Sequence, residues 1–183
     1  MIFRLFRHTP QDRIITALYG TIVAQARLPA FYRSYGVPDT VNGRLEMIML
    51  HAVLFLRRLE NQAAPARALG QELFDRFCRD MDESLREMGV GDLAVPRKMR
   101  RIGEAFYGRQ LAYRTALAAP DDEPLVATLQ RNVFAGAPEP AAAAVRLAAY
   151  VRETVRRLAA LEPEGFERGE LVFPDPEALT VGA

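Results

Sequence analysis

Hydrophobic residues recur at spacings of three and four along most of the 183-residue chain, and this spacing predicts helices rather than strands. Glycine and proline residues divide the pattern into separate segments. We therefore expect six helices, over residues 12–27, 40–61, 65–88, 95–119, 121–135 and 141–161. The expected fold is an all-α, single-domain bundle of about six helices that spans residues 1–183 and ends in a short, irregular and acidic C-terminal tail.

The second expected helix is the candidate centre of the core. It contains the longest apolar run of the chain, Leu45 to Leu56, which is interrupted only by Glu46 and His51. A membrane-spanning helix needs about 20 apolar residues, so this shorter run predicts a buried core helix. His51 could ligate haem or a metal, but a core histidine with a local hydrogen bond is favoured because no second ligand is evident.

The third and fourth expected helices meet at a glycine turn with charged residues on both sides. Met88 completes the apolar stripe of the third helix, and Gly89 is placed to end that helix in the left-handed conformation. Acidic residues dominate before the turn, and a basic cluster of Arg97, Lys98, Arg100 and Arg101 follows it. The helix dipole disfavours cations in a first turn, which suggests that the cluster contacts an acidic or anionic group. The acidic helix end before the turn, a membrane headgroup and structured RNA are the candidates, and a solvated charged face is the alternative.

The segment between the first two helices, residues 28–40, is rich in aromatic residues and is interrupted by Gly36 and Pro38. Rings in such a segment usually pack beneath neighbouring helices. The alternative is that Tyr32 and Tyr35 face a partner.

Composition narrows the class of protein. Hydrophobic residues make up 50% and charged residues 26%, and the net charge of +1 gives no general field for nucleic acid, so DNA is not an expected partner. The charge is uneven, because residues 120–183 carry six arginines against eleven acidic residues. The single cysteine fits a reducing compartment, and two histidines with one cysteine cannot form an ordinary structural zinc site. The first ten residues are too short and polar for a signal peptide, and residues 1–8 are expected to pack on the core rather than to anchor at a membrane surface.

Catalytic chemistry finds little support in the sequence. Asp80 and Asp82 are two residues apart, hence about 200° apart around a helix, and do not converge on a divalent cation. Cys78 lies in mid-helix, as small buried residues do, and Ser34 and Ser84 lack a glycine-flanked elbow. We expect no catalytic residue, no metal site and no cofactor, and instead a surface that holds a partner.

Three blocks between Ala17 and Ala119 carry a family resemblance. They read YGTIVAQAR, then GVPDTVNGRLEMIMLH followed by LRRL, then FCRDMDESLREMGVGDLAVPRKMR followed by FYGR. In length and order these blocks resemble the ubiquinol–cytochrome c chaperone family, the assembly factors for cytochrome b of the respiratory bc1 complex.

The resemblance implies a non-enzymatic chaperone that binds newly made cytochrome b before the bc1 complex assembles. Mitochondrial members of the family also associate with the ribosome and with a small partner protein. In a bacterium the same step would take place at the cytoplasmic face of the inner membrane. The implied location is therefore cytoplasmic, with peripheral contact to that membrane.

We expect the client surface where the third and fourth helices meet, together with the aromatic segment. The candidate partner-binding residues are Tyr32, Tyr35, Asp80, Asp82, Arg86, Glu87, Gly89, Gly91, Asp92, Lys98, Met99, Arg101, Phe106, Tyr107 and Arg109. Of these, Asp82 and Arg86 are four residues apart and are expected to form an ion pair within the helix.

Two other functions fit the residues alone. An RNA-contacting or ribosome-contacting adaptor would use the basic cluster that follows the turn. A less favoured alternative is an all-helical enzyme acting on an isoprenoid, which would need a deep apolar pocket with converging carboxylates.

Overall fold

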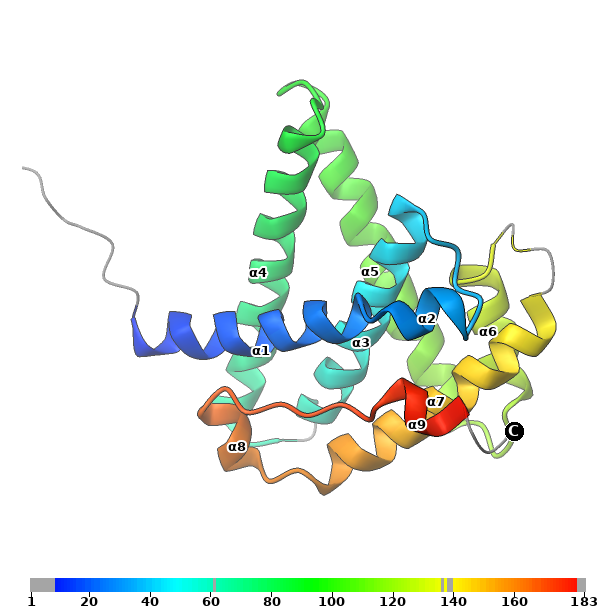
Figure 1. The fold of residues 1–183 in the computed structure, drawn as a ribbon. Helices are drawn as coiled ribbons and strands as arrows, with labels where there is room; N and C mark the ends of the chain where they lie inside the picture. The colour runs from blue at the N-terminus through cyan, green and yellow to red at the C-terminus, as the bar shows by residue number, and fades with distance from the viewer. Residues whose placement is uncertain (1–8, 61, 136, 138–139, 181–183) are drawn as a thin grey trace, which may run out of the picture.

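The computed structural model describes residues 9–60, 62–135, 137 and 140–180, and every regular element within these ranges is a helix (Figure 1). The six long helices are α1 (Pro10–Ala26), α3 (Val41–Leu59), α4 (Ala64–Glu87), α5 (Val95–Ala118), α6 (Glu123–Asn132) and α7 (Pro140–Ala160). Three helices of five residues, α2 (Pro29–Arg33), α8 (Pro163–Glu167) and α9 (Pro176–Thr180), complete the described part. The predicted all-α fold with six main helices is confirmed, and each predicted helix end lies within three residues of the observed one.

α3 is the centre of the fold. It packs against α1, α4, α5 and α7, and every residue from Glu46 to Leu56 is buried. Apolar side chains surround this stretch on all sides, so none of its faces is exposed to solvent. The prediction of a core helix at this position is confirmed.

His51 lies inside this core helix and is fully buried. Its Nδ1 is 2.8 Å from the Met47 carbonyl oxygen, which can only accept, so Nδ1 carries the proton. Its Nε2 then accepts a hydrogen bond from the Tyr150 hydroxyl at 2.9 Å. The predicted core histidine with a local hydrogen bond is confirmed.

α1 begins with a capping box, in which Thr9 and Asp12 each accept a hydrogen bond from the other's backbone N–H. The apolar side of α1, which includes Leu18 and Ile22, is buried, and the helix packs against α3 and α4. The segment Pro10–Arg33 is long and apolar enough to cross a membrane by length and composition alone. In this fold the apolar side of α1 forms part of the core.

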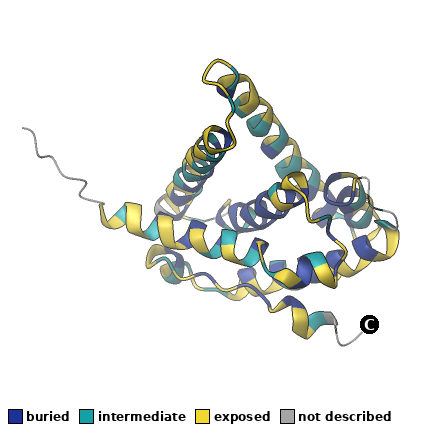
Figure 2. Cartoon of the chain, turned by 45° about the horizontal axis from the view of Figure 1, so that its top comes forward, coloured by how far each residue is buried: buried dark blue, intermediate teal, exposed yellow. Residues whose placement is uncertain are grey.

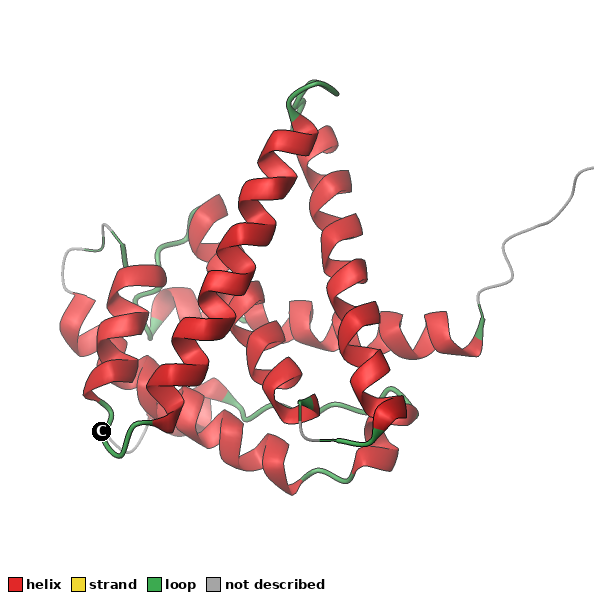
Figure 3. Cartoon of the chain, turned by 180° about the vertical axis from the view of Figure 1, so that it is seen from behind, coloured by secondary structure: helices red, strands yellow, loops and turns green. Residues whose placement is uncertain are grey.

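α4 and α5 form a hairpin that projects from the body, and we call its turn, residues 88–94, the tip (Figures 1 and 3). Gly89 ends α4 with a φ of 79°, as predicted. Its N–H donates to the Arg86 carbonyl at 2.9 Å, and the N–H of Val90 donates to the Leu85 carbonyl at 3.0 Å. These bonds satisfy carbonyl groups that would otherwise lack partners at the helix end.

The two helices of the hairpin diverge from the tip towards the body (Figure 3). At their middle they are joined by aromatic packing, with the ring centroid of Phe106 lying 4.9 Å from that of Phe74 and 5.0 Å from that of Phe77. The hairpin is therefore held by aromatic rings at its middle and closed by a glycine at its tip.

Replacing Gly89 with alanine is expected to lower the free energy of unfolding by about 1 kcal/mol, because a side chain in the left-handed conformation costs roughly 1–2 kcal/mol. A Cβ at this position would meet nothing within 4 Å, so the cost arises from the backbone. Gly91→Ala is the matched control, since Gly91 lies outside the left-handed region and also has open space around it. Urea denaturation should show a change within about 0.5 kcal/mol for the control, and equal losses for the two variants would contradict the explanation.

Two segments are more regular than the sequence predicts. The aromatic segment contains α2, and the C-terminal tail, predicted to be irregular, contains α8 and α9. Each of these short helices has a proline in its first turn, which favours helix initiation even where the surrounding composition is typical of a loop. Between α8 and α9, Leu171 and Phe173 are buried and Val172 is exposed, as expected for an extended segment that docks on the body.

The C-terminal tail is hydrogen-bonded to α1 and to the segment just after α2. The Gln25 side chain donates to the Pro174 carbonyl at 2.8 Å, and the Tyr35 hydroxyl donates to the Pro176 carbonyl at 3.0 Å. Residues 1–8, for which the sequence predicts docking on the core, lie outside the described residues.

Candidate functional site

A groove of about 380 Å³ lies between the start of α3, the end of α4 and the start of α5. Seven apolar side chains line it, namely Val41, Leu45, Ile48, Met81, Leu85, Met88 and Ile102. The other lining residues are Arg27, Arg44, Ser84 and Glu87. We call this the α3–α5 groove. An apolar floor with a few charged groups is typical of a site for a hydrophobic partner.

Two apolar residues of the groove are open to solvent. Val41 is 70% exposed and Met88 is 56% exposed. The prediction that Met88 belongs to the buried stripe of α4 is wrong, because Met88 is the C-cap residue and lies beyond the last helical turn, whereas Leu85 is 8% exposed. Large apolar side chains exposed beside a groove mark a candidate contact surface.

A close turn brings the start of α3 to the groove. Thr40 caps the helix by accepting a hydrogen bond from the Gly43 N–H at 3.0 Å. A Cβ on Gly43 would lie 2.0 Å from the Pro38 carbonyl oxygen, so only glycine lets the preceding loop approach so closely. This turn places Val41 and Arg44 on the side of the groove opposite α4.

Arg44 links the groove to the aromatic segment. Its Nε donates to Asp39 at 2.6 Å, which lowers the pKa of Asp39, and its guanidinium lies 5.3 Å from the ring centroid of Tyr32. Tyr32, a predicted partner-binding residue, is half-buried beside the groove. Tyr35, also predicted, is 1% exposed and packs in the core, so its ring is not on the surface of this structure.

Arg86 holds the tip together. It donates to Asp82 at 2.6 Å across one helical turn and to Asp92 at 2.5 Å across the tip. The predicted Asp82–Arg86 ion pair is confirmed, and the hydrogen bond to Asp82 raises the pKa of Arg86. These are solvent-exposed pairs, which contribute little to stability, so they order the turn more than they stabilise the fold. Glu87 lies beside them on the exposed surface and lines the groove.

Asp80 connects α4 to α1 instead of facing outward. Its carboxylate accepts a hydrogen bond from the Tyr19 hydroxyl at 2.8 Å. Burial, followed by this hydrogen bond, raises the pKa of Tyr19. Asp82 is engaged separately with Arg86, and the described residues contain no group of three or more His, Cys, Asp or Glu side chains that could hold a metal ion.

Arg109 forms a two-point ion pair with Glu46 of α3, at 2.6 Å and 3.1 Å. Glu46 is 3% exposed and the Arg109 side chain is 26% exposed. Two of the three predicted residues in this part of α5 thus have internal contacts, because Phe106 is also buried, at 1% exposed. The hydrogen bond to Glu46 raises the pKa of Arg109.

The basic cluster at the start of α5 is exposed. Arg100 pairs with Glu104 at 2.8 Å, while Arg97, Lys98 and Arg101 form no ion pair with any described residue. Of the partners considered from the sequence, the acidic helix end before the turn is therefore excluded within the described part of the chain. Met99, in the middle of the cluster, is half-buried against the core.

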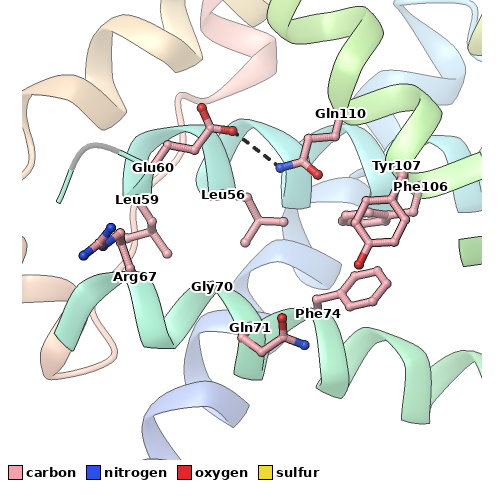
Figure 4. Close-up of a pocket in the computed structure, with 10 residues that line it drawn as sticks. All are labelled: Leu56, Leu59, Glu60, Arg67, Gly70, Gln71, Phe74, Phe106, Tyr107 and Gln110. Carbon is pink, nitrogen blue, oxygen red and sulfur yellow. Dashed lines mark hydrogen bonds between the residues drawn. The ribbon is translucent and has the colours of Figure 1, made fainter. Parts of the chain in front are cut away.

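Tyr107 lies on a different hollow of the hairpin (Figure 4). This hollow of about 350 Å³ is lined by Leu56, Leu59, Glu60, Arg67, Gly70, Gln71, Phe74, Phe106, Tyr107 and Gln110. Tyr107 is 58% exposed there and its ring centroid lies 5.2 Å from that of Phe74. The predicted set is thus divided between the α3–α5 groove, the tip, the core and this second hollow.

The groove itself is the feature that sequence reasoning missed. Val41, Leu45 and Ile48 occur at helical spacing at the start of α3, and their shared side was visible in the sequence. The sequence does not show that α4 and α5 leave this side uncovered, since that depends on contacts between residues far apart in the chain.

Comparison with known proteins places these features in a family. The sequence matches the family described as ubiquinol-cytochrome C chaperone over residues 33–173, so the match extends beyond Ala119. Ubiquinol-cytochrome-c reductase complex assembly factor 1 of Xenopus laevis is 24% identical over 157 residues, which cover 85% of this chain and 78% of that protein. The human protein of the same name is 24% identical over 147 residues, covering 80% of this chain and 49% of its own length. The chain therefore spans about half the length of the human relative.

A solved structure supports the same relationship. The crystal structure of the Cbp3 homolog from Brucella abortus matches with a TM-score of 0.83 and 38% sequence identity, over 92% of each chain. The fold and the sequence match agree, and the chain belongs to the ubiquinol–cytochrome c chaperone family.

Proposed function

We propose that this protein is a non-enzymatic assembly chaperone that binds newly made cytochrome b through the α3–α5 groove and supports biogenesis of the bc1 complex. Its curated relatives are named as assembly factors of ubiquinol–cytochrome c reductase, which makes a subunit of that complex the natural client. In a bacterium the binding would take place at the cytoplasmic face of the inner membrane.

The apolar groove with exposed edges is the observation that carries the proposal. A polytopic membrane protein presents apolar helices before it is assembled, and an apolar groove can cover one side of such a helix. Met81 and Met88 contribute flexible side chains, which adapt to clients of irregular shape. Arg27 adds positive charge beside the apolar lining, where it can meet a polar end of the client segment, whereas Arg44 is paired with Asp39.

The geometry gives less support to an isoprenoid enzyme. The groove is lined by a single carboxylate, Glu87, whereas Asp80 bonds to Tyr19 and Asp82 to Arg86. That arrangement is not the convergent set that a metal–diphosphate site requires.

Charge placed in the groove is expected to remove client binding without unfolding the protein. Val41→Glu combined with Met88→Glu alters two exposed positions at the edges of the groove. The double variant should weaken capture of cytochrome b by roughly tenfold or more, since two lost apolar contacts at about 1 kcal/mol each, together with two charges placed against an apolar client, exceed that amount. The measurement is complementation of a gene-deletion strain, with assembled bc1 complex quantified against other respiratory complexes and cytochrome b counted in pull-downs.

The matched control is Val145→Glu combined with Val172→Glu, because these apolar residues are 57% and 60% exposed on other surfaces. The control should restore bc1 levels. Normal bc1 complex in the deletion strain would reject the proposed function, and normal capture by the groove variant would reject the groove as its site.

A further inference from the structure

We infer that the tip of the α4–α5 hairpin docks on an anionic lipid surface through Leu93 and the cations at the start of α5. The inference rests on the proposed function to the extent that a membrane-protein client gives the chaperone a reason to approach a bilayer. It names a docking surface that adjoins the client groove and shares Met88 with it.

The tip presents an apolar side chain at the end of a projection. Leu93 is 100% exposed and lies in the turn farthest from the body (Figures 1 and 2). Met88, at 56% exposed, continues the apolar surface from the tip to the α3–α5 groove. A single exposed leucine is common on soluble proteins, so the charged residues around Leu93 are needed to identify the kind of partner surface that it could contact.

Asp92, directly before Leu93, is paired with Arg86, and beyond Leu93 the start of α5 carries positive charge that is unpaired within the described residues. Arg97, Lys98 and Arg101 are exposed and form no ion pair with any residue of the described ranges. They occupy the first two turns of α5, where the helix dipole opposes cations, so their position does not arise from helix stability. An apolar side chain beside a group of free cations suits the interface of an anionic bilayer, in which the apolar group enters and the cations meet phosphates.

The acidic residues of the tip define which side docks. Glu83 and Glu87 are exposed on α4, and Asp82 and Asp92 share the single positive charge of Arg86, so the α4 side carries a net negative charge. An anionic surface would repel the α4 side and attract the α5 side. The hairpin is therefore expected to lie on its α5 side, with Leu93 as the inserted group.

The combination of an exposed leucine with free cations favours a lipid surface over RNA as the partner. Structured RNA would use Arg97, Lys98 and Arg101 for its phosphates but has no use for a fully exposed leucine in the same patch. Docking by the α5 side also brings the groove close to the bilayer, because Ile102 of the groove lies one turn beyond Lys98 on the same side of α5. A client segment leaving the membrane would meet the groove there.

Vesicle binding by the purified full chain tests the inference without any client. The protein is expected to co-float with phosphatidylcholine/phosphatidylglycerol vesicles and not to bind vesicles of phosphatidylcholine alone. Binding to the anionic vesicles should decrease as the salt concentration is raised. Lys98→Glu combined with Arg101→Glu should weaken partitioning by at least about tenfold, and Leu93→Ser should weaken it by roughly tenfold. Arg114→Glu combined with Arg146→Glu is the matched charge control and should bind as the unmodified protein does.

A fluorescence reporter distinguishes insertion from surface attraction. The chain contains no tryptophan, so Leu93→Trp supplies a single indole whose emission should shift to shorter wavelength on anionic vesicles. Val172→Trp, at an exposed site elsewhere, should not shift.

Absence of binding to anionic vesicles, or equal binding by the Lys98/Arg101 variant, would overturn the inference. So would RNA binding that the charge reversals abolish and Leu93→Ser leaves intact, combined with no vesicle binding. None of these outcomes alters the bc1 levels that test the proposed function, so the two can fail independently.

Discussion

Replacing Arg109 with alanine is expected to lower the free energy of unfolding by about 3–5 kcal/mol, because the change leaves the Glu46 carboxylate buried without its counter-charge. Glu46 is 3% exposed, and both of its oxygens accept hydrogen bonds from the guanidinium. In the unmodified protein Glu46 has almost no access to water, so solvation through the space that the arginine vacates can offset only part of the loss. Urea denaturation, with the slope checked for two-state behaviour, measures the loss.

Two further variants separate this explanation from simple loss of a side chain. Arg100→Ala removes an exposed arginine that pairs with Glu104, and it is expected to change the free energy of unfolding far less than Arg109→Ala does. Glu46→Leu combined with Arg109→Leu removes both charges and should recover much of the stability lost by Arg109→Ala. A loss of less than about 1 kcal/mol for Arg109→Ala would show that the buried charge is tolerated, contrary to the argument.

Arg109→Ala also tests whether Arg109 contacts the client directly. Arg109 was a candidate partner-binding residue, and its ion pair makes a structural role sufficient to explain it. Client capture should therefore fall in Arg109→Ala only in proportion to the fraction of folded protein, which circular dichroism on the same sample would establish.

Acidification is expected to destabilise the protein through His51. Burial lowers the pKa of His51 from 6.5 to about 4. The folded protein holds His51 neutral while the unfolded chain takes up a proton below pH 6.5, so stability present at neutral pH is lost as the pH falls from 6.5 to about 4. A shift of this size corresponds to about 3 kcal/mol at the acid end of the window.

The surroundings of His51 explain why protonation is unfavourable. Nε2 accepts from the Tyr150 hydroxyl, whose oxygen in turn accepts from the Gln25 side chain at 3.0 Å. A proton on Nε2 would put two donors against each other and would place a charge in the core, packed against the ring of Phe173.

Urea denaturation from pH 7 to pH 4 should show a steeper fall for the unmodified protein than for His51→Gln. Carboxylates titrate in both proteins, so the difference between the two profiles isolates His51. If the variant is too unstable to compare, the imidazole resonances of the unmodified protein give its pKa directly. Titration of His51 near pH 6.5 would contradict the expected effect.

Local signals in the sequence were sufficient for the helices and for part of the tip. Gly89 ends α4, Asp82 pairs with Arg86, and His51 bonds within its own helix, and each of these depends on residues at most a few positions apart. Short-range geometry is fixed by the helical repeat, so spacing alone predicts such contacts.

Contacts between distant residues could not be predicted in this way. Asp80 bonds to Tyr19 and Arg109 to Glu46, at sequence separations of 61 and 63 residues. The Asp80 carboxylate and the Arg109 guanidinium were both expected on the surface, because each lies near the polar side of its own helix. Their internal contacts arise only from the packing of another helix against that side. The groove depends on the same long-range packing, and therefore the sequence indicated a partner surface without showing its shape.

The fastening of the C-terminal tail has a consequence for synthesis of the chain. Gln25 bonds to a carbonyl 149 residues later, and Tyr35 bonds to one 141 residues later. Most helical bundles gain their contacts locally and early, whereas these two bonds form only when almost the entire polypeptide has been made. While the chain is still being translated, α1 and α2 lack their final covering, and the last segment to be synthesised completes the packing of the first.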